Sequence, residues 1–206
     1  SMKRARRSVG YRVMNTDVPK TNGPVPVNID DGLDLDTAVI VALGSNDKGV
    51  WPSCRHGLQA ALARFRAEGL DVVARSSWWH SSAWPDPTDP PFLNGVVIVR
   101  TALDPHALMA ALGRIEEAFG RHRGPRNGPR TLDLDLIAYG RIRGDLNGLI
   151  LPHPRAAGRL FVMGPLAEIA PDWMHPDGAG RAADLATTAP VGRDARAIPD
   201  GDASWT

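Results

Sequence analysis

The chain has 206 residues, of which 43% are hydrophobic and 23% are charged, which is typical of a globular protein with one well-packed core. The formal net charge is +1, so overall charge gives no reason to expect a nucleic-acid or membrane partner. The single cysteine, Cys54, excludes an intramolecular disulfide and a cysteine-based metal cluster, and it fits a reducing, cytoplasmic location. No apolar run approaches the roughly 18–20 residues that a membrane-spanning helix needs.

The two ends of the chain lack the periodic apolar pattern of packed elements. Residues 1–35 start with basic residues, continue with scattered prolines and end in aspartates, so we expect a disordered tail. Residues 179–206 are rich in glycine, alanine and aspartate, and we expect them to be weakly structured apart from a short helix at 181–187. These boundaries leave residues 36–178 as one folded domain.

The first half of the domain predicts a strand, a helix and a second strand. Residues 37–43 form a nearly continuous apolar run before the turn residues Gly-Ser-Asn at 44–46, which predicts a buried strand. Apolar side chains recur at helical spacing over residues 53–68, and Gly69 follows, which predicts a helix that ends there. β-Forming residues then predict a strand at 70–79.

A long loop separates this strand from a third one, which we expect at 92–101. The loop, residues 80–91, contains four prolines that keep it out of a sheet interior, and loops of this length inside a compact domain are often functional. Asp104 and Pro105 favour the first positions of a second helix, which Gly120 would close.

An arginine-rich loop at 121–130 leads to a fourth strand that starts at Leu132. The resulting order, strand–helix–strand–strand–helix–strand, predicts an α+β protein with the ferredoxin-like βαββαβ sandwich, in which helices pack on a four-stranded antiparallel sheet. Apolar residues over about 155–169, before Pro171, predict a helical C-terminal extension.

The fourth strand carries the strongest chemical signal in the chain. Leucines alternate with Asp133 and Asp135, so both carboxylates point to one face of the strand and the leucines to the other. At a rise of roughly 3.3 Å per residue the two Cα atoms lie about 6–7 Å apart, which suits one or two divalent cations shared with a polyphosphate, and oxygen ligands favour magnesium. An isolated pair of this kind is more often just the solvated face of a half-exposed strand.

Four arginines change that balance, because they crowd the approach to the acidic strand: Arg121, Arg123, Arg126 and Arg130. Cations beside paired carboxylates suit a metal–polyphosphate ligand, since the cations bind phosphate oxygens while the carboxylates hold the metal. Glycine and proline residues in the same loop would let it open and close as a lid.

Five short motifs occur in order along the chain: Gly44-Ser45-Asn46, Phe92-Leu93-Asn94, Gly128-Pro129-Arg130-Thr131-Leu132-Asp133-Leu134-Asp135, Pro152-His153-Pro154-Arg155 and Pro165-Leu166-Ala167-Glu168-Ile169-Ala170-Pro171. Together they resemble the 6-hydroxymethyl-7,8-dihydropterin pyrophosphokinases of folate biosynthesis, over about residues 37–178. The resemblance implies an ATP-dependent diphosphotransferase, which moves the β,γ-diphosphate of ATP onto the hydroxymethyl group of the reduced pterin and releases AMP.

The resemblance also implies a role for each candidate site residue. Asp133 and Asp135 match the two aspartates that hold two Mg²⁺ ions. The four arginines named above match a mobile catalytic loop and its flank, which contact ATP phosphates or close over the site. The residues implied on the ATP side are Glu116, Arg130, His153 and Arg159. The residues implied around the pterin are Ser81, Ser82, Trp84, Phe92, Asn94 and Phe161.

These roles agree with the chemistry of the side chains. Phe92 and Phe161 would sandwich a flat heteroaromatic ring, and the Asn94 amide would bind its edge. Taken singly, each phenylalanine is more readily explained as a core residue, and Glu116 could simply pair with a neighbouring arginine. The joint presence and order of the motifs favour the functional interpretation over these structural ones.

Two other functions stay open. The first is a non-catalytic nucleotide- or pterin-binding module on the same fold, because a fold alone does not give a function; the intact aspartate pair and the arginines argue against it. The second is nucleic-acid binding through the basic N-terminal tail, although the predicted sheet lacks the aromatic pattern of RNA-binding sheets. We expect a monomer whose partners are ATP and the pterin, without nucleic acid or a membrane.

Overall fold

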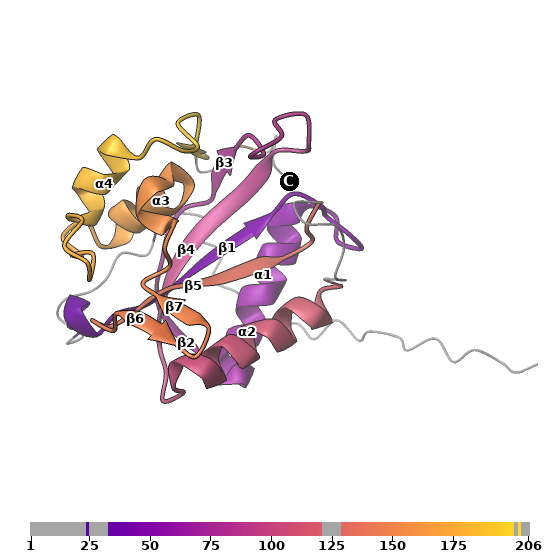
Figure 1. Ribbon diagram of the computed structural model, residues 1–206. Coiled ribbons are helices and arrows are strands. Elements are labelled where there is room, and N and C mark those ends of the chain that lie inside the picture. The colour runs from indigo at the N-terminus through magenta and orange to yellow at the C-terminus, as the bar shows by residue number, and fades with distance from the viewer. Residues whose placement is uncertain (1–23, 25–32, 121–128, 200–201, 203–206) are drawn as a thin grey trace, which may run out of the picture.

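The computed structural model describes residues 24, 33–120, 129–199 and 202 (Figure 1). Its centre is an antiparallel sheet of six strands with helices on both faces, and a hairpin forms a second sheet of two strands. The predicted α+β class is therefore confirmed, whereas the predicted four-stranded sheet is too small. Among the helices of the described residues, none has both the length and the apolar character to cross a membrane.

Strand β1 (Val39–Ser45) lies in the middle of the large sheet. It pairs antiparallel with β4 (Phe92–Arg100) on one side and with β5 (Asp133–Tyr139) on the other. Six of its seven residues are buried, because neighbouring strands cover both edges and helices cover both faces. This position explains why residues 39–43 are all apolar instead of alternating with polar ones.

The second predicted strand, at 70–79, is in fact two strands, β2 (Asp71–Arg75) and β3 (Trp79–Ser81), which both pair with β4. The break comes at two serines. Ser76 Oγ accepts a hydrogen bond from the backbone of β4 at 3.0 Å and donates one to the carbonyl of Ser77 at 2.7 Å. These side-chain bonds take the place of regular ladder bonds, and that local competition is hard to read from β-propensity.

Helices α1 (Cys54–Phe65) and α2 (Pro105–Ala118) cover one face of the sheet. Ser53 and Asp104 cap their N-termini, each accepting a hydrogen bond from a backbone N–H of the first turn. A 3-10 turn, η3 (Arg66–Glu68), follows α1. The apolar stripes of both helices pack in one cluster with β5 through Leu58, Phe65, Leu108, Leu112, Leu134 and Leu136.

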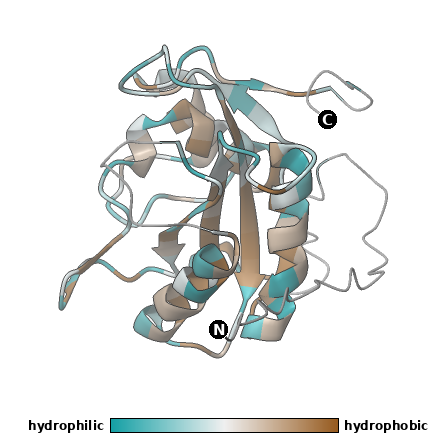
Figure 2. Ribbon diagram, turned by 90° about the vertical axis from the view of Figure 1, so that its right-hand side faces the viewer, coloured by the Kyte–Doolittle hydropathy of each residue, from teal (hydrophilic) through white to brown (hydrophobic). Residues whose placement is uncertain are grey.

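Helices α3 (Leu160–Ile169) and α4 (Ala182–Thr188) pack on the opposite face, after a 3-10 helix, η4 (Ala156–Gly158). The helical extension predicted at 155–169 thus consists of η4 and α3. Figure 2 shows the hydrophobic central strands running between the helices. The second apolar cluster includes Ile40, Val96, Ile98, Ile137, Met163, Leu166 and Trp173.

The C-terminal segment is more ordered than its composition led us to expect. Besides α4 it contains β8 (Arg196–Ala197), which pairs with β3 at the edge of the sheet. Its buried side chains are Ala182, Leu185, Ala189, Ala195 and Ile198. Alanines fit between closely packed elements, so few large apolar residues are needed. The packed part of the chain therefore continues beyond residue 178, where we expected it to end.

The remaining elements flank the core. A 3-10 helix, η2 (Leu35–Thr37), precedes β1, and most of the expected N-terminal tail lies outside the described residues. After β5 comes the hairpin of β6 (Gly144–Leu146) and β7 (Leu149–Leu151). Its turn residues, Asn147 and Gly148, have φ values of 52° and 93°, a conformation that these two residue types adopt readily.

Candidate active site

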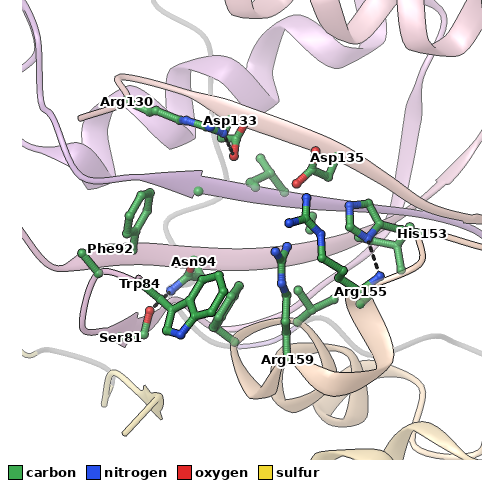
Figure 3. Close-up of a pocket in the computed structure, with 18 of the residues that line it drawn as sticks. Ser81, Trp84, Phe92, Asn94, Arg130, Asp133, Asp135, His153, Arg155 and Arg159 are labelled. Atoms are coloured by element: carbon green, nitrogen blue, oxygen red, sulfur yellow. Dashed lines mark hydrogen bonds and ion pairs between the residues drawn. The ribbon is translucent and has the colours of Figure 1, made fainter. Parts of the chain in front are cut away.

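A pocket lies between the sheet and the η4–α3 segment (Figure 3). Its floor follows the strand register: Gly44 of β1 lies between Asn94 of β4 and Asp133 of β5, and Ala42 lies opposite Asp135. The middle strand thus contributes at most a methyl group, while both neighbours carry polar side chains. The floor is consequently a trough, with an amide on one side and two carboxylates on the other.

Both aspartates of the acidic strand line this pocket. Leu134 and Leu136, which alternate with Asp133 and Asp135, are buried against α1 and α2 on the other face. Ile137 also lines the pocket and gives the acidic pair an apolar neighbour. The predicted alternation therefore places the carboxylates together, in front of a cavity.

Arg130 is held beside the acidic pair by the turn after β1. Its Nη1 atom lies 2.6 Å from Asp133 Oδ2. Its backbone N–H donates to Asn46 Oδ1 at 2.8 Å, and Asn46 N–H donates back to the Arg130 carbonyl at 3.0 Å. Asn46 Nδ2 also donates to the carbonyl of Pro90 at 3.0 Å. Asn46 therefore ties three segments together, a role that its place in a turn motif did not reveal.

His153, Arg155 and Arg159 enter the pocket from the η4 side (Figure 3). Burial lowers the pKa of His153 from its ordinary value of 6.5, and the charges of Arg159 and Arg155 lower it further. Its Nδ1 accepts a hydrogen bond from Arg155 N–H at 3.2 Å, so the neutral ring carries its proton on Nε2. The ring therefore offers a neutral N–H donor.

Two neighbouring guanidinium groups make this end of the pocket attractive for an anion. Burial lowers the pKa of Arg159, and repulsion from Arg155 adds to the effect, whereas Asp135 and Asp133 oppose it. An anion between the arginines would relieve that repulsion. Arg155 was missing from our candidates, although it lies two residues after the histidine in the Pro-His-Pro-Arg motif.

Asn94 marks the other end of the trough. Its Nδ2 donates to Ser81 Oγ at 3.0 Å and to the carbonyl of Trp79 at 3.4 Å. These bonds fix the plane of the amide and therefore the direction of its oxygen. Trp84 is 57% exposed. The six residues that the resemblance assigned to the pterin all line the pocket: Ser81, Ser82, Trp84, Phe92, Asn94 and Phe161.

Glu116 is not among the residues that line the pocket. Its Oε1 accepts a hydrogen bond from Leu134 N–H at 2.7 Å, at the edge of β5 that does not pair with β1. This bond supports the strand that carries both aspartates, and the place of Glu116 on the ATP side stays a prediction. The predicted loop residues Arg121, Arg123 and Arg126 lie outside the described residues.

The donor set fits magnesium. Within the described part of the chain, no group of three or more His, Cys, Asp or Glu side chains is placed to hold a metal ion. Asp133 and Asp135 instead form a pair facing the pocket. Magnesium commonly takes one or two carboxylates and completes its octahedron with substrate phosphates and water. A site of this kind is formed together with a phosphorylated ligand.

Comparison with known proteins identifies the family. Residues 40–171 match the sequence model of a family described as 7,8-dihydro-6-hydroxymethylpterin-pyrophosphokinase (HPPK). That range covers more than half of the chain, and it contains the acidic pair and His153. The chain belongs to the HPPK family. The predicted resemblance is thereby confirmed.

Curated relatives include two pyrophosphokinases and a bifunctional folate synthesis protein. The HPPK chain is 44% identical over 138 residues to the 2-amino-4-hydroxy-6-hydroxymethyldihydropteridine pyrophosphokinase of Synechocystis, which covers 66% of this chain and 68% of that protein. The enzyme of the same name from Pseudomonas aeruginosa is 43% identical over 141 residues, covering 68% of this chain and 85% of the enzyme. A mitochondrial folate synthesis bifunctional protein of Pisum sativum is 38% identical over 136 residues, which cover 65% of this chain and 25% of that protein.

Solved structures share the fold. A crystal structure described as HPPK-DHPS in complex with substrates matches 73% of this HPPK chain with a TM-score of 0.58 and 14% identity. A Plasmodium falciparum HPPK-DHPS with pterin and p-hydrobenzoate matches the same share with a TM-score of 0.57 and 13% identity. The matches cover 43% and 44% of those longer chains, so this chain corresponds to less than half of each.

Proposed function

We propose that this HPPK chain transfers the β,γ-diphosphate of ATP to the hydroxymethyl group of 6-hydroxymethyl-7,8-dihydropterin, releasing AMP, in folate biosynthesis. The observation that carries the proposal is that the acidic pair, the arginines and the aromatic–amide end line one pocket. Membership of a pyrophosphokinase family supports the same reaction. The intact acidic pair and the family membership favour the catalytic function over a module that only binds its ligands.

The layout of the trough suits an in-line transfer. With the pterin at the Asn94 end and the triphosphate at the Asp133 end, the hydroxymethyl oxygen would approach the β-phosphorus. The new O–P bond forms there, the bond from the β-phosphorus to the α,β-bridging oxygen breaks, AMP leaves with that oxygen, and the hydroxyl proton passes to solvent. Such a transfer gains its rate mainly from alignment and charge neutralisation.

Asp133 and Asp135 are the residues that we propose to hold magnesium, as two ions. When bound, magnesium neutralises phosphate charge and fixes the triphosphate. Arg130 pairs with Asp133 at 2.6 Å in the structure, so it lies close enough to exchange that carboxylate for a phosphate oxygen. Glu116 contributes indirectly, because its bond to Leu134 N–H supports the strand that carries both aspartates.

The η4 side of the pocket would bind the nucleotide. We assign the Nε2–H of His153 as a neutral donor and the guanidinium groups of Arg155 and Arg159 as phosphate ligands, because all three side chains line the pocket near the acidic pair. Charge-assisted, bidentate bonds to phosphate are typical of arginine. Arg121, Arg123 and Arg126, outside the described residues, remain proposed members of a catalytic loop.

The other end would bind the pterin. Phe92 from β4 and Phe161 from α3 line different walls and would stack on the ring, while Asn94 would bind its edge. Ser81 at the end of β3, with Ser82 and Trp84 from the loop that follows, would complete the wall through backbone and side-chain contacts.

Two further proposals concern architecture. The order β5-β1-β4-β2 with α1 and α2 supports a ferredoxin-like core, to which β3 and β8 are additions. The described site residues of this chain line a single pocket, and we propose that the chain acts as a monomer.

The nucleotide product tests the proposal. Purified protein mixed with ATP, Mg²⁺ and the hydroxymethyl dihydropterin should form AMP in equal amount to pterin diphosphate, as followed by anion-exchange chromatography. Omitting the pterin should stop AMP formation. ADP as the nucleotide product would overturn diphosphate transfer, and pterin binding without turnover would favour the non-catalytic alternative.

A further inference from the structure

The C-terminal segment after α4 runs along the wall of the pocket that Arg159 and Phe161 belong to. Val191 N–H donates to the carbonyl of Gly158 at 3.0 Å, and the Val191 carbonyl accepts from Leu160 N–H at 2.9 Å. These two bonds lie on either side of Arg159. They fix the backbone at the junction of η4 and α3.

Gly192 continues this contact. Its φ is +71°, and a Cβ atom there would lie 2.5 Å from Cδ1 of Phe161. Real Cβ atoms do not approach so closely, so the phenylalanine ring occupies space that only a glycine leaves free. The position of Phe161 in the pocket therefore depends on the C-terminal segment.

Two residues later the same segment reaches the opposite wall. Asp194 Oδ2 accepts a hydrogen bond from Ser82 N–H at 2.6 Å. Hydrogen bonds from the backbone and side chain of Ser82 lower the pKa of Asp194, which keeps the carboxylate ionised. Next, β8 pairs with β3, and Ile198 N–H donates to the Trp78 carbonyl at 2.8 Å. The segment thus joins the wall of Ser82 and Trp84 to the wall of Phe161.

We propose that Asp194 is a positioning residue for the pterin end of the pocket, because its carboxylate holds the Ser82–Trp84 wall in place relative to Phe161. This inference rests on the proposed function, since it takes those walls to contact the pterin. Asp194 lies beyond residues 40–171, the range that matches the family model, so family membership assigns it no role. Its effect passes through Ser82 and spares the nucleotide end.

Three variants separate this role from a general contribution to folding. Asp194→Ala removes the acceptor, and Asp194→Asn keeps an acceptor oxygen without the charge. Asp184→Ala is the matched control, because Asp184 is also an exposed carboxylate of the C-terminal segment, paired with Arg181 at 3.0 Å on α4. Asp194 is exposed, so its replacement leaves the core intact.

Amide hydrogen exchange without ligands gives the first measurement. Asp194→Ala should speed exchange at the Ser82 amide, and the control should not. The second is the dissociation constant of the pterin by titration, together with KM for pterin and ATP. Asp194→Ala should weaken pterin binding about fivefold, a modest effect because the charged hydrogen bond is exposed. KM for ATP should stay at the wild-type value, and Asp194→Asn should recover most of the affinity.

Several results would overturn the inference. One is a Ser82 amide exchange rate or a pterin affinity that Asp194→Ala leaves unchanged. Another is an equal rise of the KM values for pterin and for ATP. A third is that Asp194→Asn binds the pterin as weakly as Asp194→Ala does. Failure of the proposed function looks different, because the wild-type protein would then form no AMP. Even in that case, the titration of the variants with the pterin still tests the role of Asp194. A wild-type protein that binds no pterin would contradict both proposals.

Discussion

The two faces of the sheet differ in what they do, although the same strands form both. On the face covered by α1 and α2, Leu134 and Leu136 close an apolar cluster. On the other face, Asp133 and Asp135 line the pocket. Successive residues of a strand point to opposite faces, so on β5 the leucines pack in the core and the aspartates between them face the pocket. Neighbouring substitutions should therefore have separable effects.

The pocket face itself changes character along its length. Toward one end, Ile40, Val96 and Ile98 are buried in an apolar cluster with α3. Toward the other end, Ala42 comes two residues after Ile40 on β1, and Asn94 comes two residues before Val96 on the antiparallel β4. Both line the pocket. A pocket arises where small side chains on the middle strand replace large ones, and the rest of the same face holds α3 in place.

The largest expected effect comes from the acidic pair. Asp133→Asn and Asp135→Asn should each lower turnover about a thousandfold, because magnesium loses a charged ligand and the phosphates lose its neutralising charge. Coupled detection of AMP measures the rate. The exposed Asp71→Asn on β2 is the matched control and should retain wild-type turnover. Near wild-type rates in both site variants would remove the acidic pair from the mechanism.

The next residue along the strand should behave in the opposite way. Leu134 is 3% exposed, and Leu134→Ala should lower the free energy of unfolding by about 3 kcal/mol, through lost burial and the cavity left behind. Urea denaturation gives the value. Turnover of the folded protein should stay close to wild type. A variant that keeps its stability but loses its turnover would contradict the division between the two faces.

The nucleotide end offers a smaller test. Arg155→Ala should raise KM for ATP roughly tenfold, the effect of losing one charge-assisted hydrogen bond, while KM for the pterin changes little. Steady-state kinetics with each substrate varied in turn measure both constants. Arg143→Ala, which removes an exposed arginine paired with Asp177, serves as the control. An unchanged KM for ATP would exclude Arg155 from phosphate binding.

The smallest expected effect is a pH dependence of stability. Burial lowers the pKa of His153 below 6.5 in the folded protein, so the unfolded chain binds the proton more tightly. The neutral imidazole of His153 is therefore favoured in the folded protein, and acidification favours the unfolded chain. The stabilisation from His153 is complete above the pKa of the unfolded chain, and it is lost as pH falls from there toward the pKa of the folded protein. His153→Gln should make urea-unfolding curves less dependent on pH in that window.

His175 provides a comparison on the same face of the sheet. Burial also lowers its pKa, so it contributes with the same sign, and the double variant with His175→Gln should flatten the dependence further. A wild-type stability that rises on acidification through this window would contradict both assignments.

Local patterns in the sequence predicted much of this arrangement. The alternation around Asp133 and Asp135 predicted which side chains share a face, and Asp104 predicted the start of α2. Both depend on bonds and geometry within a few residues, which a sequence displays directly.

Features that depend on distant partners could not be predicted in this way. The break of the second strand at Ser76 needs the backbone of β4, and the hydrogen bond of Glu116 needs Leu134 N–H as its partner. The order of the C-terminal segment comes from alanines packed against α3 and from contacts with β3, which composition does not reveal. Arg155 lay within a quoted motif but became a candidate only when the pocket showed its position.

The most direct test of the central claim is the phosphorus NMR spectrum of a reaction of the wild-type protein with ATP, Mg²⁺ and the hydroxymethyl dihydropterin, beside the same mixture with Asp135→Asn. If the pocket aligns the triphosphate on the acidic pair with the pterin alcohol, the wild-type spectrum should show an AMP resonance and two mutually coupled resonances of a pterin diphosphate. These resonances should be nearly absent for Asp135→Asn. A single pterin monophosphate resonance with ADP, or equal product from both proteins, would contradict it.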